Sequence, residues 1–291
     1  MTLLSGTHSD APSVGTLLRG WRERAALSQL ELALRADSSA RHISFIETGR
    51  TAPSREMVLK LAATLDVPVR ERNTLLLSAG FAPAFAATPL DDPALQQVRG
   101  ALERMVAAYQ PYPALVLDGC YTVVAANAGL AALLEGVAPH LLEPPLNAMR
   151  ITLHPEGLAP RIRNLAEWRG HLLDQMSRQL ALHRSPALRA LHDEVAAYPL
   201  PGPGSPAPGD ASAPVPGDPA VDPADGARAA ETADQPRFAL PLVIEHGGQT
   251  LSFLSTIATF NTPLDVTVSE LAVETFLPAD TATAKALHGT G

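Results

Sequence analysis

Between residues 14 and 80, apolar positions recur at the three- and four-residue spacing of short amphipathic helices. In the first helix, Leu18 and Trp21 fall on one side and charged residues occupy the other. A fourth and a fifth helix follow Pro53-Ser54 and Pro68. The pattern predicts five helices that form one compact all-α domain over residues 14–80.

Polar side chains mark where the second and third of these helices begin. Ser28 can cap the first amides of the second helix, while Glu31, three residues on, can reach back to the Ser28 amide. The turn and cap formers Asp37-Ser38-Ser39 then end that helix and start the third, which ends at Gly49. Both helices are therefore short and are separated by a tight turn.

The pattern changes after Gly80. Residues 81–94 are rich in proline and are predicted to form a connection, and residues 95–109 are helical. Two β-prone runs, 114–117 and 121–125, flank Asp118-Gly119, which is a hairpin signal. Asn127 then offers an N-cap for an alanine- and leucine-rich helix through Leu134, a role that we prefer to a ligand contact.

The rest of the body combines helices and strands. Pro160 begins a long predicted helix to His183, and another helix runs to Tyr198. Three antiparallel strands are predicted at 240–245, 250–260 and 266–276, because each run is β-prone and bounded by turn formers. The sequence thus predicts an α+β domain over residues 95–291. Within it, His154-Pro155 is expected to form a turn.

Two segments are expected to lack fixed structure. Residues 1–13 carry no amphipathic pattern and are predicted to be flexible. Residues 199–236 hold ten prolines, with glycine, alanine and aspartate and no aromatic residue. Such a segment buries too little apolar surface to offset its chain entropy, so it is predicted to be a disordered insertion within the second domain.

Composition narrows the class of protein. A length of 291 residues suits two domains, and the formal charge of −8 hides an uneven distribution. Residues 14–80 hold ten basic and seven acidic side chains, a net charge of +3, which leaves −11 for the remaining chain. The N-terminus lacks a signal-peptide pattern, and the apolar stretch 114–134 contains Asp118 and Asn127, so a cytoplasmic protein without a membrane span is expected.

The spacing from Gln29 to Glu47 is the most informative motif. Ala33 provides the small residue that two steeply crossing helices require, and Ile43 and Ile46 place an apolar stripe against that contact. The opposite face of the third helix then points outward and can enter the major groove of DNA. That face consists of Ser39, Ala40, Arg41, Ser44 and Phe45.

Individual DNA contacts follow from side-chain chemistry. Arg41 is the best candidate for reading a base, because its guanidinium matches O6 and N7 of guanine. Gln29 and Arg50 flank the motif and suit phosphate contacts that fix the register. For the domain as a whole, the alternative is a plain helical bundle or a protein-binding domain. For single residues, Arg41 could instead be solvated, and Phe45 could pack on the first helix instead of touching a thymine methyl group. His42 suits either a DNA contact or the edge of the helix interface.

These residues resemble the helix-turn-helix of the Cro/C1-type (XRE) repressor family. The resemblance covers residues 14–80, above all Leu27-Ser28-Gln29-x-Glu31-Leu32-Ala33 and Ile43-x-x-Ile46-Glu47-x-Gly49-Arg50. Family members usually carry Gly-Val in the turn, where this chain has Asp37-Ser38. Because aspartate tolerates the left-handed conformation less well than glycine, we expect a somewhat destabilised turn.

The body is similar to the MmyB-like group of regulators. The motifs include Pro111-Tyr112-Pro113-Ala114, Leu153-His154-Pro155-x-Gly157, Trp168 and Thr262-Pro263-Leu264-Asp265-Val266-Thr267. The resemblance covers almost the whole chain apart from the proline-rich insertion. It implies a C-terminal PAS-like ligand-sensing domain and, as for related proteins, a long apolar ligand of the fatty-acid kind.

Residue patterns in the body suggest where such a ligand would lie. Trp168 and His171 share one side of a helix, and Phe253 lies on one strand face, so these three are the candidate ligand-binding residues. The alternative is that all three are core residues. No bound cofactor other than this ligand is expected.

Catalysis and metal binding gain no support from the sequence. The nine histidines include no His-Glu-x-x-His motif, the lone Cys120 suits a buried position, and no nucleophile elbow, P-loop or dinucleotide fingerprint occurs. We therefore expect no enzyme and no metal site. The expected protein is a homodimeric, sequence-specific regulator that binds double-stranded DNA and senses a small apolar ligand; the alternative is a DNA-binding regulator whose body serves only dimerisation or partner recruitment.

Overall fold

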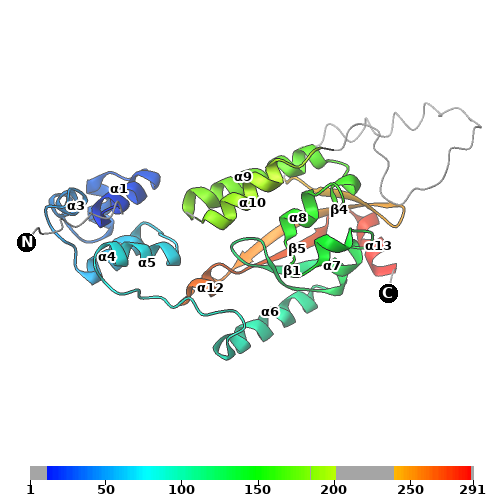
Figure 1. Ribbon diagram of the computed structural model, residues 1–291, viewed down its shortest axis with the longest axis horizontal. Helices are drawn as coiled ribbons and strands as arrows, with labels where there is room; N and C mark the ends of the chain where they lie inside the picture. The colour runs from blue at the N-terminus through cyan, green and yellow to red at the C-terminus, as the bar shows by residue number, and fades with distance from the viewer. Residues whose placement is uncertain (1–11, 184, 201–238, 290–291) are drawn as a thin grey trace, which may run out of the picture. The chain divides into compact units, whose positions relative to one another are not determined.

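The computed structural model describes residues 12–183, 185–200 and 239–289, and the segments predicted to be flexible or disordered fall almost entirely outside these ranges. The chain divides into two compact units (Figure 1). The N-terminal unit comprises Met1–Leu95 together with Phe260–Glu270, and the C-terminal unit comprises Gln96–Thr259 and Leu271–Gly291. Within the described residues, no helix combines the length and the apolar character that crossing a bilayer requires.

Five helices build the N-terminal unit, as the apolar spacing predicted. Four of them begin at a serine whose side chain accepts a backbone hydrogen bond, and the second carries the complete capping box of Ser28 and Glu31. The helices are α1 (Val14–Arg24), α2 (Gln29–Arg35), α3 (Ala40–Glu47), α4 (Arg55–Thr64) and α5 (Val69–Ser78). A sixth, the short α12 (Val266–Ser269), comes from the distant segment in this unit.

The C-terminal unit is built around a five-stranded antiparallel sheet with the order β2-β1-β5-β4-β3. Its strands are β1 (Ala114–Leu117), β2 (Val123–Ala126), β3 (Leu242–His246), β4 (Gln249–Thr259) and β5 (Ala272–Pro278). The last strand pairs with both β1 and β4, so it lies at the centre and joins strands that are far apart in the sequence.

Helices cover the sheet. Helix α6 (Gln96–Ala108) contacts β1, β2 and β5, while α9 (Leu165–Leu182) and α10 (Pro186–Ala196) lie alongside each other (Figure 1). Leu115 and Leu117 belong to the core shared with α9 and α10, so the alternate residues of β1 face away from that core. The remaining helices are α7 (Ala128–Leu133), α8 (Ala148–Leu153), α13 (Thr281–Gly289) and the 3-10 turns η1 (Pro93–Leu95), η2 (Pro139–Leu142) and η3 (Ala159–Arg161).

Several sequence predictions for the body need correction. Residues 266–269 form α12 instead of the start of a strand, because Asp265 Oδ1 accepts hydrogen bonds from the amides of Thr267 and Val268. The long helix begins at Leu165, after the 3-10 turn η3, and not at Pro160. Tyr121 precedes β2 in a turn and has a φ of 61°, so it is not a strand residue.

Two local predictions are confirmed. Asn127 caps α7, since its Oδ1 accepts a hydrogen bond from the amide of Leu130 at 3.0 Å. The segment that begins at His154 is a turn that follows α8. Helices α8 and α13 were not predicted, because both are short and follow no clear apolar period.

Candidate DNA interface and ligand cavity

Helix α3 is held against α1 and α2 by the predicted apolar stripe. Ile43, Ile46 and Ala33 are each 1% exposed and belong to one hydrophobic core. Gly15 of α1 makes the close approach possible, because a Cβ atom at this position would lie 2.3 Å from the backbone oxygen of Ile46. A glycine that sequence analysis did not single out therefore sets the distance between α1 and α3.

A set of buried hydrogen bonds around Arg22 and Glu47, here called the Arg22–Glu47 brace, links the same three helices. Arg22 of α1 donates to both carboxylate oxygens of Glu47 at 2.6 and 3.0 Å and to the backbone oxygen of Leu27 at 2.8 Å. Gln29 Nε2 donates to Glu47 Oε2 at 2.8 Å. The hydrogen bond to Glu47 raises the pKa of Arg22. Loss of one partner from a buried pair costs about 3–5 kcal/mol because the other charge stays buried, so this brace fixes α3 firmly.

The outward face of α3 presents a cationic and aromatic surface. Arg41 is exposed, and its guanidinium carbon lies 5.2 Å from the ring centroid of Phe45. Arg50, also exposed, approaches the same ring at 5.7 Å. The half-buried ring thus lies within cation–π range of two exposed guanidinium groups.

The other predicted contact residues differ in their surroundings. Ser39 is exposed, yet its hydroxyl oxygen already accepts the amide hydrogen of His42 as the N-cap of α3. Ala40 and Ser44 are half-buried on the same helix. The side-chain amide of Gln29 already donates a hydrogen bond to Glu47. DNA contacts by Gln29, Ser39, Ala40, Arg41, Ser44, Phe45 and Arg50 stay predictions.

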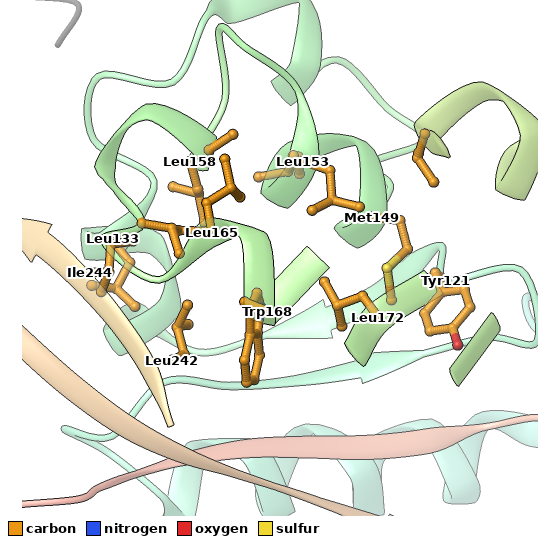
Figure 2. Close-up of a cluster of buried hydrophobic side chains, with 14 of the residues drawn as sticks. Tyr121, Leu133, Met149, Leu153, Leu158, Leu165, Trp168, Leu172, Leu242 and Ile244 are labelled. Atoms are coloured by element: carbon orange, nitrogen blue, oxygen red, sulfur yellow. The ribbon is translucent and has the colours of Figure 1, made fainter. Parts of the chain in front are cut away.

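The C-terminal unit contains an apolar cavity of about 60 Å³. It lies where α7, α8 and α9 pack on the sheet, and Figure 2 shows this core with Trp168 and Leu172 between Leu133 and Tyr121. Its wall is almost entirely apolar; among the described residues, Glu274 on the central strand β5 is its one ionisable member.

The three predicted ligand-binding residues have different positions. Trp168 is 3% exposed and lines the cavity. His171 is exposed, with its ring centroid 5.5 Å from that of Trp168, and it is not part of the cavity wall. Phe253 is fully buried and packs edge-on against Phe276, which does line the cavity. Ligand contact by these residues stays a prediction.

Sequence analysis missed Glu274, an ionisable residue that lines the cavity. Ser255 Oγ donates to Glu274 Oε1 at 2.6 Å, and burial raises the pKa of Glu274, an effect that this hydrogen bond partly opposes. Tyr121 belongs to the same hydrophobic core and is 4% exposed, but it does not line the cavity. Burial, and next the charge of Glu274, raise the pKa of Tyr121. A glutamate in a β-prone run gave no sequence signal, since its surroundings depend on β5 lying between β1 and β4.

A second hollow lies beside this cavity. A half-open groove of about 490 Å³ is formed by α7, α13 and the turn between β3 and β4. Leu133 lines both the groove and the cavity, so the two spaces adjoin at this residue.

One group of side chains has donor atoms that suit a metal ion. Ligand atoms of His140, His154 and Glu156 lie within 4.8 Å of one another. However, Nδ1 of His154 accepts the amide hydrogen of Glu156 at 3.1 Å, which leaves the hydrogen of the neutral ring on Nε2. Coordination of a metal ion through Nδ1 would replace this hydrogen bond.

Comparison with known proteins agrees with the two units. Residues 18–72 match the family model described as helix-turn-helix, and residues 98–200 match the model of the MmyB-like transcription regulator ligand binding domain. Both models describe domains of transcription regulators. No curated protein matches the chain. The chain is therefore a DNA-binding transcription regulator in which an XRE-type helix-turn-helix is followed by an MmyB-like ligand-binding domain.

Proposed function

We propose that the protein recognises a specific operator by inserting α3 into the major groove. The observation that carries this proposal is the outward face of α3, which presents Arg41 and Arg50 around Phe45 while the Arg22–Glu47 brace holds its inner face. An arginine fork reads guanine O6 and N7 and discriminates by about 1–3 kcal/mol. Arg50 and the amide end of α3 suit phosphate contacts.

Two copies of the chain would read the operator together. A homodimer places two recognition helices about 34 Å apart, one turn of DNA, over a pseudo-palindromic site. The N-terminal unit has the net positive charge that phosphate attracts, whereas the rest of the chain is acidic. The acidic remainder therefore suits dimerisation and sensing better than DNA contact.

The second part of the proposal is that the C-terminal unit senses a small apolar, fatty-acid-like ligand in a PAS-like fold. Its support is an antiparallel sheet with helices packed over an apolar cavity that Trp168 lines. The cavity of about 60 Å³ holds only a few non-hydrogen atoms. A longer chain would extend past Leu133 into the adjoining groove, which offers about 490 Å³.

The small size of that cavity also favours a second candidate function. In this alternative the C-terminal unit binds no small molecule and serves only dimerisation or recruitment of a partner. A native mass spectrum of the full chain purified from cells separates the two. A co-purified apolar molecule of defined mass supports sensing, whereas a spectrum that shows only the bare chain or its dimer supports the alternative.

The DNA-binding proposal is tested by selecting genomic fragments with the full-length protein, then measuring affinity by fluorescence anisotropy. We expect the best fragment to bind at least about 10³-fold more tightly than the same fragment with shuffled sequence. Equal affinity for both duplexes would show that the protein binds DNA without reading its sequence.

A further inference from the structure

Strand β4 is longer than the strand that covers its outer edge. It has eleven residues, whereas β3 has only five, and the pairing between them ends at Leu242 and Phe253. Pro241 precedes β3 and has no amide hydrogen, and Leu240 packs against the hydrophobic core. Within the described part of the chain, no strand pairs with this side of β4 beyond Phe253, so residues 254–259 form an open edge.

The backbone groups at the open edge belong to alternate residues. The amide and the carbonyl of Ser252 form hydrogen bonds with two residues that follow β5. Successive residues of an antiparallel strand direct their backbone groups to opposite neighbours, and the register between β4 and β5 is regular. Even-numbered residues of β4 therefore face β5, whereas the amides and carbonyls of Ser255, Ile257 and Thr259 face the open edge.

The side chains along this edge favour pairing with another strand. Edge strands of natural proteins commonly carry charged residues or proline, which prevent such pairing. The open edge has the sequence Leu-Ser-Thr-Ile-Ala-Thr and contains neither. Ile257 is 48% exposed, and Phe260, directly after the strand, is 40% exposed. The edge thus combines backbone donors and acceptors with exposed apolar side chains.

We propose that the open edge of β4 pairs in antiparallel orientation with the same edge of a second copy of the chain, which creates one continuous sheet across a homodimer. This inference rests on the proposed recognition of the operator by a homodimer and locates its interface. The occupant follows from the register. A two-fold axis at Ile257 pairs this residue with the partner's Ile257 and Ser255 with the partner's Thr259, so every residue that faces the edge meets another one.

Length and side chains fit the same register. A shift of the two-fold axis by one residue would place an edge-facing residue against Phe253, which β3 already covers, or beyond the end of the strand. In the proposed register two apolar isoleucines lie opposite each other, and the hydroxyls of Ser255 and Thr259 meet. No charged side chain of the open edge opposes its own copy. The unpaired half of β4 is therefore complementary to itself.

A cysteine at position 257 tests the register in the full-length protein. Hydrogen-bonded antiparallel pairs have Cα atoms about 5.5 Å apart, which is within the reach of a disulfide. Ile257→Cys in a Cys120→Ser background should therefore form a disulfide-linked dimer on mild oxidation. Leu182→Cys in the same background is the control, because Leu182 of α9 is 46% exposed. Crosslinking of Ile257→Cys no faster than that of the control would overturn the inference.

A charge at the same position should separate the two copies. Ile257→Lys places a lysine opposite Glu274 of β5, which one chain accommodates, whereas two copies bring like charges together. We expect the dissociation constant of the dimer, measured by analytical ultracentrifugation, to rise at least tenfold, with no change in Leu182→Lys. Mixing Ile257→Lys with Ile257→Glu should restore a dimer. An unchanged dissociation constant in Ile257→Lys would overturn the inference and leave the proposed homodimer with another interface.

Hydrogen exchange distinguishes a second copy from a cover supplied by the same chain. In the wild type, the amides of Ile257 and Thr259 should gain protection as the protein concentration rises through the dissociation constant of the dimer. Protection that does not depend on concentration would overturn the inference. A wild type that stays monomeric would overturn both this interface and the homodimer. The affinity for selected and shuffled operators then decides separately whether α3 reads DNA.

Discussion

At the scale of single residues, the same side-chain type has different roles according to its surroundings. Arg22 is buried and paired with Glu47, where it serves the fold of the N-terminal unit. Arg41 is exposed on the outward face of α3, beside the ring of Phe45, where we propose that it contacts DNA. Among carboxylates, Glu47 forms an ion pair with Arg22, whereas Glu274 accepts a hydrogen bond from the hydroxyl of Ser255. Burial and pairing, more than residue type, therefore distinguish candidate sites from structural positions.

The role of Arg41 is tested by Arg41→Ala. We expect affinity for the selected operator to fall by about 1–3 kcal/mol, with relaxed preference at one base pair, because the bidentate contact to guanine is lost. Arg104→Ala removes the same charge from the exposed surface of α6 and serves as the control. Measured over a set of single-base operator variants, an unchanged base preference in Arg41→Ala would exclude the base-reading role.

Burial of Glu274 predicts a pH-dependent stability. Its pKa in the folded protein is raised, so its contribution is fully present below the unfolded-state pKa and is lost as pH rises through the folded-state pKa. Wild type should therefore lose stability relative to Glu274→Gln between pH 4 and the folded-state pKa. Tyr121 does not change charge there, because burial raises its pKa. Urea unfolding of both proteins across this pH range measures the difference, and a constant difference would contradict the prediction.

At the scale of elements, caps and close approaches determine where helices lie. The serine caps predicted for the second and third helices begin α2 and α3, whereas the cap of α1, Ser13, lies in the segment that was predicted to be flexible. Asp37 in the helix-turn-helix turn has a φ of 44°, the left-handed conformation that was expected to strain this turn. The β-prone run predicted a strand over residues 266–276, but at residues 266–269 the Asp265 side chain caps a helical turn instead. A local pattern thus fails where one hydrogen-bonding side chain offers the backbone an alternative.

Two glycines of α1 provide a matched test of helix packing. Gly15→Ala should destabilise the N-terminal unit and weaken operator binding, because the new Cβ would lie 2.3 Å from the oxygen of Ile46 and 2.9 Å from that of Glu47. Gly20→Ala meets nothing closer than 4.0 Å and should stabilise the protein by about 0.5–1 kcal/mol through helix propensity. Thermal unfolding followed by circular dichroism measures both. Similar shifts for the two variants would show that the close contact does not limit the fold.

At the scale of the whole molecule, the segment 260–270 has a distinctive connectivity. It joins β4 to β5 of the C-terminal unit, yet it packs within the N-terminal unit. Asp265 Oδ2 accepts hydrogen bonds from the amide and hydroxyl of Thr88 at 3.1 and 2.7 Å, and Glu270 accepts two from Arg70 at 2.6 and 2.8 Å. Because β5 also carries Glu274, the strand that lines the cavity continues directly into a segment docked on the DNA-binding unit.

The hydrogen bonds of Asp265 predict that this residue holds the segment in place. Asp265→Ala should accelerate hydrogen exchange at the amides of Thr88, Thr267 and Val268, since each donates to its carboxylate. Thr88→Val removes only the hydroxyl donor and should affect the amide of Thr88 more than the other two. Exchange is followed by mass spectrometry on the full chain. Unchanged rates in Asp265→Ala would show that other contacts hold the segment.

The sequence by itself determined the features that depend on near neighbours. Helix starts at Ser28 and Ser39, the apolar stripe of Ile43 and Ile46 and the cap at Asn127 all follow from residues within one or two turns, where spacing alone fixes which groups meet. Only the tertiary structure decided that β5 lies between β1 and β4, that Glu274 lines an apolar cavity and that His171 does not. Those outcomes depend on contacts between residues far apart in the chain, which no local period encodes.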